Sequence, residues 1–336
     1  MSFQKIGLAA LVGFSTLVSA AAAQDKPTLT IYTYDGFAAE WGPGPQLKAG
    51  FEENCECTVD FVGADSSIGA LRKAQLEGPG TQADIILGLD TSVAAEAKNT
   101  ELFVDHNVDL SALELPVDYA SSQFVPFDYG YFAFVYDSSK IETPPTSFEE
   151  LAALSEEFKI AIQDPRSSTP GLGLVLWMQA AKGDQADKLW ADIAPNILTV
   201  TKGWSESYSL FLEGEADMVL SYTSSPSYHR IAEEESKYLA AQFEEGHYVQ
   251  IELAGILESS DQKQLANDFL TYLVSQAGQS IIPTTNWMFP VVPLDNGLPE
   301  GFDTPLPKEN SLILDDETVG QNTKKYIDDF FAAIGQ

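Results

Sequence analysis

Short apolar runs separated by amphipathic segments make up the first third of the chain. Three of these runs are rich in β-branched and aromatic residues, which is typical of strands: residues 29–34, 59–62 and 85–89. Between them, Pro45 is placed to open one helix, and Ser66 and Ser67 to cap another that covers residues 68–77 and ends at Gly78. This alternation predicts a parallel sheet with helices on both faces.

A second series of strands and helices follows in the middle of the chain. Residues 159–163 and 218–222 are predicted strands, and helices are expected from Pro170 and after Ser205. Thr169 fits the N-cap of the first of these helices, because a proline suits the first helical position. The two series together predict two α/β lobes.

Two longer β-prone runs connect the lobes. Residues 124–136 are strongly aromatic and long enough to leave one lobe and enter the other, and residues 248–256 can return. We therefore expect a two-lobed α/β clamshell with its ligand in the interlobe cleft. The first lobe starts with residues 24–125, the second covers residues 126–250, and residues 251–336 return to the first lobe and add C-terminal helices.

The N-terminus has the pattern of an export signal. Lys5 is followed by an apolar run over residues 6–18 and by the small residues Ala21-Ala22-Ala23. Because the run is too short to span a bilayer, residues 1–23 are predicted to be a signal peptide that is cleaved near Ala23. No cysteine follows the run and no later stretch is apolar enough for a membrane helix, so we expect a soluble exported protein.

Composition narrows the possible partners. The 336 residues carry a formal net charge of −32, which disfavours nucleic acid because binding to a phosphate backbone needs clustered lysine and arginine. Cys55 and Cys57 are the two cysteines, and on a predicted strand they lie near the upper limit of disulfide geometry. In an oxidising compartment we expect them to form a local, structural disulfide. Two cysteines without further ligands are a weak metal signal.

Candidate ligand contacts gather where the predicted strands end. In sheets of this kind, ligands lie outside the carboxyl ends of the strands. Nine residues fall at or just beyond such ends: Tyr34, Asp35, Ser66, Ser67, Asp90, Ser168, Thr169, Trp204 and Tyr222. The helix starts at Pro170 and Pro226 offer free backbone N–H groups and nearby hydroxyls, which suit a phosphate. With flat aromatic faces beside them, the chain predicts a pocket for an aromatic ligand that carries a phosphate.

Each of these residues has an ordinary structural alternative. A tyrosine near a strand end often packs in the core, and Ser-Pro and Thr-Pro pairs are common helix caps. Trp177 is expected in the core, because it follows an apolar helical run. Trp204 is the stronger ligand candidate, because it falls in a predicted turn rather than on a periodic core face.

Seven segments carry a resemblance to a known family: residues 32–38, 41–45, 124–137, 163–173, 199–206, 220–229 and 286–288. The string Trp-Gly-Pro-Gly-Pro at 41–45 and the string Asp-Pro-Arg-Ser-Ser-Thr-Pro-Gly-Leu-Gly at 164–173 are far more specific than short motifs. In these segments the chain resembles the periplasmic thiamine-binding proteins that feed thiamine ABC importers. The likeness extends over nearly the whole mature chain.

The resemblance implies a type II periplasmic binding fold, in which each lobe is a mainly parallel sheet flanked by helices. It implies a periplasmic location, a membrane permease as partner, and thiamine, thiamine monophosphate or thiamine diphosphate as transported ligand; we expect no cofactor. The ring contacts of the family are matched by Tyr34, Trp204, Tyr222, Tyr228 and Trp287, and its phosphate contacts by Ser168, Thr169, Thr223, Ser224 and Ser225. Asp35 and Asp90 can add charge or hydrogen bonds to a cationic ring. Where family members carry Asp-Gly, this chain has Ser66-Ser67.

Two other functions compete with a thiamine receptor. A ferric-ion receptor can use tyrosine phenolates from residues 221–229, although a bare ion leaves the clustered tryptophans unexplained. A periplasmic phosphate-ester hydrolase needs a nucleophile and base or a metal cluster, and the sequence has three histidines and neither an H-E-x-x-H nor a G-x-S-x-G motif. Catalysis is the least favoured of the three, and no catalytic or metal-binding residue is assigned.

Overall fold

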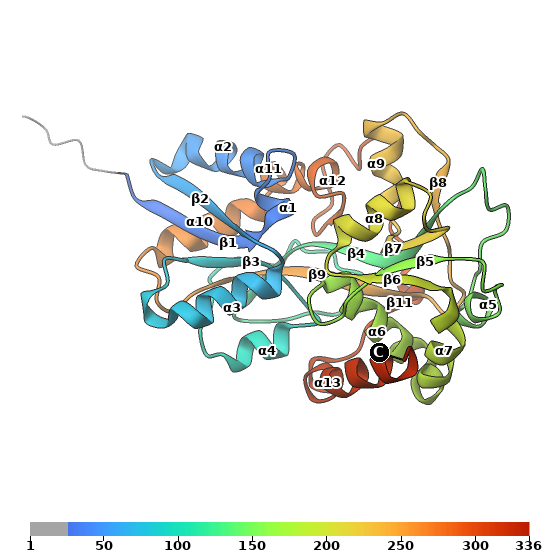
Figure 1. The fold of residues 1–336 in the computed structure, drawn as a ribbon. Coiled ribbons are helices and arrows are strands. Elements are labelled where there is room, and N and C mark those ends of the chain that lie inside the picture. The colour runs from blue at the N-terminus through green and yellow to red at the C-terminus, as the bar shows by residue number, and fades with distance from the viewer. Residues whose placement is uncertain (1–25, 336) are drawn as a thin grey trace, which may run out of the picture.

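The chain forms two α/β halves that lie side by side and share one sheet (Figure 1). The computed structural model describes residues 26–335, so the predicted signal peptide lies outside the described residues. The first half starts with these elements: β1 (Thr28–Tyr34), α1 (Asp35–Ala38), α2 (Gly44–Cys55), β2 (Thr58–Ala64), α3 (Ser67–Glu77), β3 (Ile85–Asp90) and α4 (Ala94–Asn99).

Two long strands connect the halves, β4 (Phe124–Asp137) and β9 (His247–Ile256). Between them, the second half contains α5 (Phe148–Ala152), β5 (Ile160–Gln163), α6 (Thr169–Lys182), α7 (Ala186–Ile193), β6 (Ile197–Thr201), α8 (Trp204–Leu212), β7 (Met218–Tyr222), α9 (Ser225–Ala232) and β8 (Tyr238–Ala240). After β9 follow α10 (Lys263–Leu273), α11 (Gln276–Gln279), α12 (Ile282–Thr285), β10 (Phe289–Pro290), β11 (Ser311–Leu312) and α13 (Asp316–Ala333).

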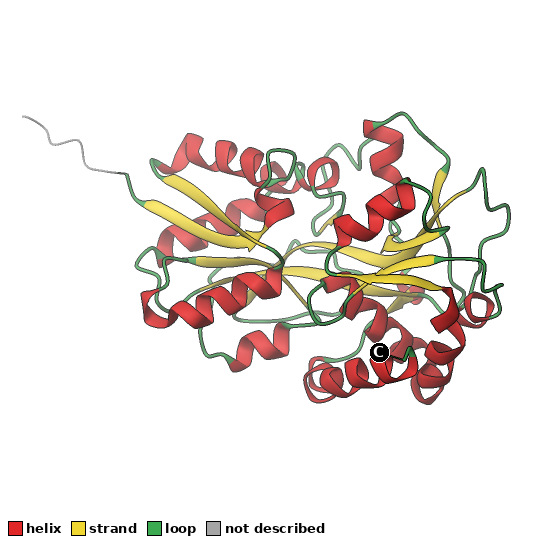
Figure 2. Ribbon diagram, viewed as in Figure 1, coloured by secondary structure: helices red, strands yellow, loops and turns green. Residues whose placement is uncertain are grey.

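The strand order across the sheet is β2-β1-β3-β9-β4-β7-β5-β6, and helices cover the strands from both sides (Figure 2). Strand β1 is parallel to β2 and β3 in the first half, and β5 is parallel to β6 and β7 in the second. The central strands β9 and β4 run antiparallel to each other and to their outer neighbours. The mixed α/β architecture predicted from the sequence is therefore confirmed.

Strand β4 passes from one half into the other. Residues 124–131 pair with β9, whereas residues 132–136 pair with β7 of the second half. Every residue of β4 and β9 is buried, which explains why both read as nearly continuous apolar runs. The two predicted crossings are confirmed as strands.

Two details of the second half differ from the sequence-based expectation. Ser168 rather than Thr169 is the N-cap of α6, Thr169 is the first helical residue, and the side chain of Ser168 makes no capping hydrogen bond. Trp204 opens helix α8 instead of lying in a turn. In both cases the helix begins one or two residues earlier than propensity alone indicates, since termini depend on tertiary contacts.

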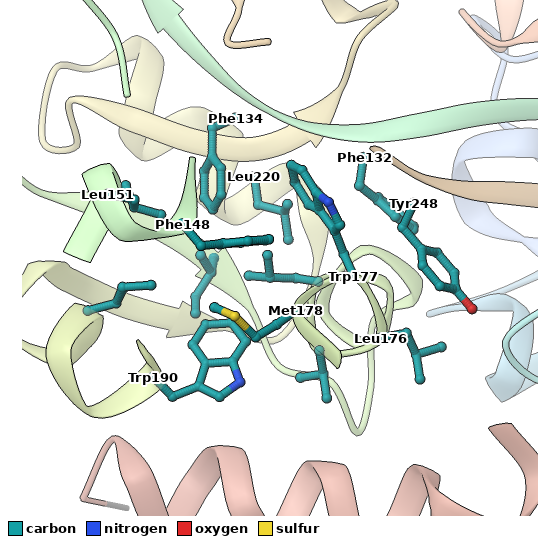
Figure 3. Packing of buried hydrophobic residues seen from close by; sticks show 14 of the residues in the cluster. Phe132, Phe134, Phe148, Leu151, Leu176, Trp177, Met178, Trp190, Leu220 and Tyr248 are labelled. Atoms are coloured by element: carbon teal, nitrogen blue, oxygen red, sulfur yellow. The ribbon is translucent and has the colours of Figure 1, made fainter. Parts of the chain in front are cut away.

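A large aromatic core fills the second half (Figure 3). Trp177 of α6 is fully buried, as predicted, and packs edge-on against Phe148 with ring centroids 4.9 Å apart. Its indole N–H donates to the carbonyl of Gly246 over 2.9 Å, so its one polar atom is satisfied. Helix α13 packs on α6 and α7 from below, with Phe330 against Trp190.

Cys55 and Cys57 are joined by a disulfide, with their Cα atoms 5.1 Å apart. The prediction that the pair lies on a strand is wrong: Cys55 is the last residue of α2, and Cys57 precedes β2. Glu56 between them adopts a left-handed conformation with φ 49°, which turns the chain back so that the sulfurs meet.

Among the helices of residues 26–335, none combines the length and the apolarity needed to cross a membrane.

Candidate ligand-binding site

The strand ends of both halves converge on the middle of β4. Tyr34, Asp90 and Tyr222 are the last residues of β1, β3 and β7. Asp90 and Asp128 of β4 both pair with Glu252 of β9, so they lie at the same level of the sheet, and Tyr222 pairs with Phe132 of β4. Asp128 and Phe132 are four residues apart along β4, which corresponds to about 13 Å. The carboxyl ends of the two parallel sets therefore face each other where the halves meet, as the fold class predicts.

The hydroxyls of two predicted ring contacts, one from each half, are tied to the same strand. Tyr34 donates to Glu252 over 3.1 Å and lies 3.0 Å from the amide oxygen of Asn286. Tyr222 donates to Gln250 over 2.8 Å, and the Gln250 amide donates to Glu252 over 3.0 Å. These bonds hold the two aromatic rings in place from behind. Burial and the nearby carboxylates raise the pKa of both tyrosines well above 10, so both stay protonated.

Trp204 presents one face outward. Its other face stacks on Tyr208 at 4.6 Å, and its indole N–H donates to Ser221 over 2.8 Å. The side chain is 37% exposed, which is unusual for a tryptophan held so firmly. Tyr208 is itself fixed by His229, whose other ring nitrogen bonds Glu233 over 2.6 Å. The arrangement provides a rigid aromatic platform beside the end of β7.

Trp287 and Tyr228 meet across the boundary between the halves. Their rings pack edge-on with centroids 5.2 Å apart. Trp287 has a φ of 57°, a conformation that costs energy for a residue other than glycine and that clusters at functional sites. Lys202, after β6, also bridges the boundary by an ion pair with Asp65, after β2. The two sides are thus in direct contact at this edge.

The predicted hydroxyl contacts fall into two groups. The hydroxyls of Thr223 and Ser224 are buried without a hydrogen-bond partner within residues 26–335, as expected of groups that await a ligand. By contrast, Ser225 bonds Ser221 and the Tyr222 amide, and Ser66 caps α3 by accepting from Gly69.

The other predicted polar contacts differ in exposure. Ser67 and Ser168 are buried, whereas Asp35 is exposed at the start of α1. Asp90 is buried, and burial raises its pKa even though the Ser92 backbone N–H donates to its Oδ1 over 2.6 Å. The Thr169 side chain of the second half lies near this carboxyl of the first and lowers its pKa in part.

Sequence reasoning missed four polar residues of this region. Asp128, Gln250, Glu252 and Asn286 connect the tyrosines, and all lie in or beside the crossing strands. A signal was present: Asp128 is the one charged residue in residues 124–136, and Gln250 and Glu252 interrupt residues 248–256. Burying a polar side chain in a strand costs free energy unless it is hydrogen-bonded, so such residues indicate a hydrogen-bond network or a functional site.

Comparison with known proteins places this arrangement in a family. Residues 28–280 match the bacterial extracellular solute-binding protein family. The chain belongs to this family. Membership agrees with the two halves and the crossing strands, and it shows that the fold is that of periplasmic binding proteins.

Several relatives of this solute-binding protein have names that specify a ligand. A thiamine-binding periplasmic protein from Salmonella typhimurium (strain LT2) is 46% identical over 320 residues, which cover 95% of this chain and 97% of the relative. The thiamine-binding periplasmic protein of Escherichia coli (strain K12) is 45% identical, covering 93% and 94%. A solved structure of a periplasmic thiamin binding protein superposes with a TM-score of 0.88 at 43% identity, covering 97% of this chain and all of that one.

The similarity to thiamine-binding periplasmic proteins favours a thiamine receptor over the two competing functions. Within residues 26–335, no group of three or more His, Cys, Asp and Glu side chains is arranged to hold a metal ion. His229 bonds Tyr208 and Glu233, and His247 bonds a backbone carbonyl, so neither is paired with a nucleophile. The relatives are binding proteins rather than enzymes.

Proposed function

We propose that this protein is a periplasmic receptor that captures thiamine and its phosphate esters and delivers them to the membrane permease of an ABC importer. One observation carries the proposal: aromatic side chains from both halves converge at the strand ends, in a chain that is 46% identical to a thiamine-binding periplasmic protein over nearly its full length. Export and cleavage near Ala23 would leave the receptor soluble in the periplasm, and it needs no cofactor.

Thiamine suits this set of residues chemically. Its thiazolium ring is a permanent cation and its aminopyrimidine is flat, so both rings gain from stacking, and the thiazolium also gains cation–π attraction of roughly 0.5–2 kcal/mol per contact. We assign the ring contacts to Tyr34, Trp204, Tyr222, Tyr228 and Trp287. Trp204 has the clearest free face, since its other face is occupied by Tyr208.

A phosphate ester would occupy the hydroxyl-rich helix starts. Helix α6 has 14 residues and no side-chain cap, so its first backbone N–H groups remain available to an anion. Thr223 and Ser224 add buried hydroxyls without partners in the described part of the chain. We assign the phosphate contacts to these two residues together with Ser168, Thr169 and, through its backbone, Ser225.

The lobes would close around the ligand about the two crossing strands. We assign residues 24–125 and the returning residues 251–336 to the first lobe, and residues 126–250 to the second. Helix α13 contacts α4 of the first lobe and α6 and α7 of the second, so it bridges the two. A ligand that touches both lobes binds the closed state more tightly, which gives the permease a signal to recognise.

Calorimetry on ligand-free protein tests the proposal. The protein is unfolded, dialysed and refolded to remove any bound molecule, and then titrated with thiamine, thiamine monophosphate and thiamine diphosphate. We expect tight binding of at least one form with a stoichiometry of one, and recovery of the ligand chemically intact. The absence of binding by all three would refute the receptor, and a hydrolysed phosphate ester would favour the hydrolase.

A further inference from the structure

Three carboxylates lie side by side on the central strands of the sheet. The strand registers pair Asp90 of β3 with Glu252 of β9, and Glu252 with Asp128 of β4. Residues directly opposite one another on neighbouring strands share a face of the sheet, so the three side chains form one row, which we call the carboxylate row. Their exposed fractions are 1%, 6% and 0% for Asp90, Glu252 and Asp128.

The backbone is irregular on both sides of this row. The register shifts between Leu87 and Leu89 on β3, and again between Pro126 and Asp128 on β4. At the first shift, Gly88 has a φ of 93°, which favours glycine. Bulges of this kind turn the following side chain toward a new direction and are common next to functional sites. Two of them at the same level of the sheet bring Asp90 and Asp128 level with Glu252.

No cation of the protein compensates the row. Within the described chain, none of the ion pairs includes Asp90, Asp128 or Glu252. Their hydrogen bonds come from neutral donors: the Ser92 backbone, the Asn286 and Gln250 amides and the Tyr34 hydroxyl.

Two oxygens of the row lack even a neutral donor. Oδ2 of Asp90 and Oδ1 of Asp128 are buried without any partner in residues 26–335. Structural carboxylates at this depth are normally paired, because an isolated buried charge is very costly. The row therefore differs from an ordinary structural acid.

The row lies behind the aromatic side chains of both halves. Glu252 accepts from Tyr34 of the first half and, through Gln250, connects to Tyr222 of the second. Asp128 accepts a hydrogen bond over 2.7 Å from Asn286, which is the residue before Trp287. The row is thus joined by hydrogen bonds to two of the aromatic side chains that we assign to the ring contacts and to the residue beside a third.

We propose that the carboxylate row is the charge-selecting element of the site: it supplies the counter-charge for a flat cationic ring held by the aromatic side chains, and it makes the protein prefer that cation over a neutral ring of the same shape. The inference rests on the proposed thiamine-binding function and identifies the residues that give it specificity. Cation–π attraction to the aromatic faces already favours the cation by roughly 0.5–2 kcal/mol per contact, and a buried negative charge adds a longer-ranged preference of the same sign.

A consequence is that ligand binding releases protons. The groups that face Glu252 are Asp90, Asp128, Tyr34 and Tyr222, and none of them is basic. Burial raises the pKa of Asp128 to about 8, and burial with repulsion from Asp128 and Asp90 raises that of Glu252 well above its usual range. Near neutral pH the empty row therefore holds protons, and a bound cation favours the ionised carboxylates and displaces them.

The first test compares two ligands in three proteins. The ligands are thiamine and deazathiamine, a neutral isostere in which carbon replaces the charged thiazolium nitrogen; the proteins are wild type, Asp128→Asn and Asp84→Asn. Asp84 is a buried carboxylate that bonds Thr30 and Ser260 at the opposite end of β3, so it is a matched control. We expect wild type to prefer thiamine by roughly 10- to 100-fold, Asp128→Asn to lose most of that preference, and Asp84→Asn to keep it.

An equal loss of affinity for both ligands in a folded Asp128→Asn variant would show that Asp128 acts only structurally and would overturn the inference. A wild type that binds both ligands equally would overturn it as well, while leaving a thiamine receptor intact. A wild type that binds neither would refute the receptor itself.

The second test needs no variant. Calorimetry at pH 7 in buffers of different ionisation enthalpy reports the protons exchanged on binding. Thiamine should release a measurable fraction of a proton or more per site, and deazathiamine much less. Zero proton release with both ligands would overturn the charge-selecting role even if every row variant failed to fold.

Discussion

Replacing Asp128 by Asn should change how the stability of the ligand-free protein depends on pH. Asp128 is fully buried on β4, and burial raises its pKa from 3.8 to about 8. A carboxyl whose pKa is higher in the folded state binds more protons there than in the unfolded state. Its contribution to the free energy of unfolding is fully present below the pKa of the unfolded state, and it is lost as pH rises toward the pKa of the folded state.

The size of the effect follows from the width of this window. Each pH unit between about 4 and 8 lowers the free energy of unfolding by about 1.4 kcal/mol for one such group, so about 4 kcal/mol is lost between pH 4 and pH 7. Asn cannot ionise and still offers an oxygen to the Asn286 amide. The variant and the wild type should therefore be similarly stable near pH 4.5, and the variant should be more stable by about 3–4 kcal/mol at pH 7.

Denaturant unfolding followed by tryptophan fluorescence at several pH values measures this difference. Ligand must be removed first, because a bound cation would stabilise the wild type selectively. Asp65→Asn is a useful control: Lys202 lowers the pKa of this exposed carboxyl, so its contribution is lost as pH falls rather than rises. A difference between Asp128→Asn and wild type that stays constant from pH 4.5 to 8 would refute the reasoning.

Three further predictions concern the binding site. Trp204→Ala should weaken thiamine binding by ~1–3 kcal/mol, or roughly 5- to 150-fold, with loss of fluorescence quenching, whereas Trp204→Phe should lose less because it keeps an aromatic face; unchanged affinity in a folded Ala variant would remove Trp204 from the site. Replacing both Ser168 and Thr169 by Ala should weaken the binding of thiamine phosphates more than that of thiamine, and calorimetry showing equal losses would contradict their placement at the phosphate. The ring centroids of Tyr228 and Trp287 are 5.2 Å apart, whereas a thiamine ring inserted between the two side chains needs about 7 Å. We therefore expect thiamine to enter through a more open form. Small-angle scattering should then show a smaller radius of gyration with thiamine than without, and identical profiles would argue against lobe closure.

The alternation of strands and helices could be predicted because it depends on local patterns. Strand β7 has the predicted bounds, and β1, β3, β4, β5 and β9 differ from the prediction by one residue at one end. Helices α4 and α7 were missed. Helix α4 is short and packs against α13, whereas α7 carries a local signal that was overlooked, because its apolar residues Leu189, Trp190 and Ile193 lie on one buried face. The helix start at Trp204 was misplaced for a related reason, because the indole is anchored by Ser221 and Tyr208, which are distant in the sequence or one turn away.

The sequence by itself determined the class of fold, the aromatic and hydroxyl residues near the strand ends, and the family to which the chain belongs. These follow from apolar periodicity and from motifs of consecutive residues, both of which can be read locally. Only the tertiary structure decided that Asp90, Asp128 and Glu252 form one row behind Tyr34 and Tyr222. The three carboxylates lie on strands separated by up to 162 residues, and their alignment depends on two register shifts that no local pattern encodes. The charge selection that we propose therefore depends on strand pairing, whereas the proposed aromatic contacts come from residues at or after the strand ends.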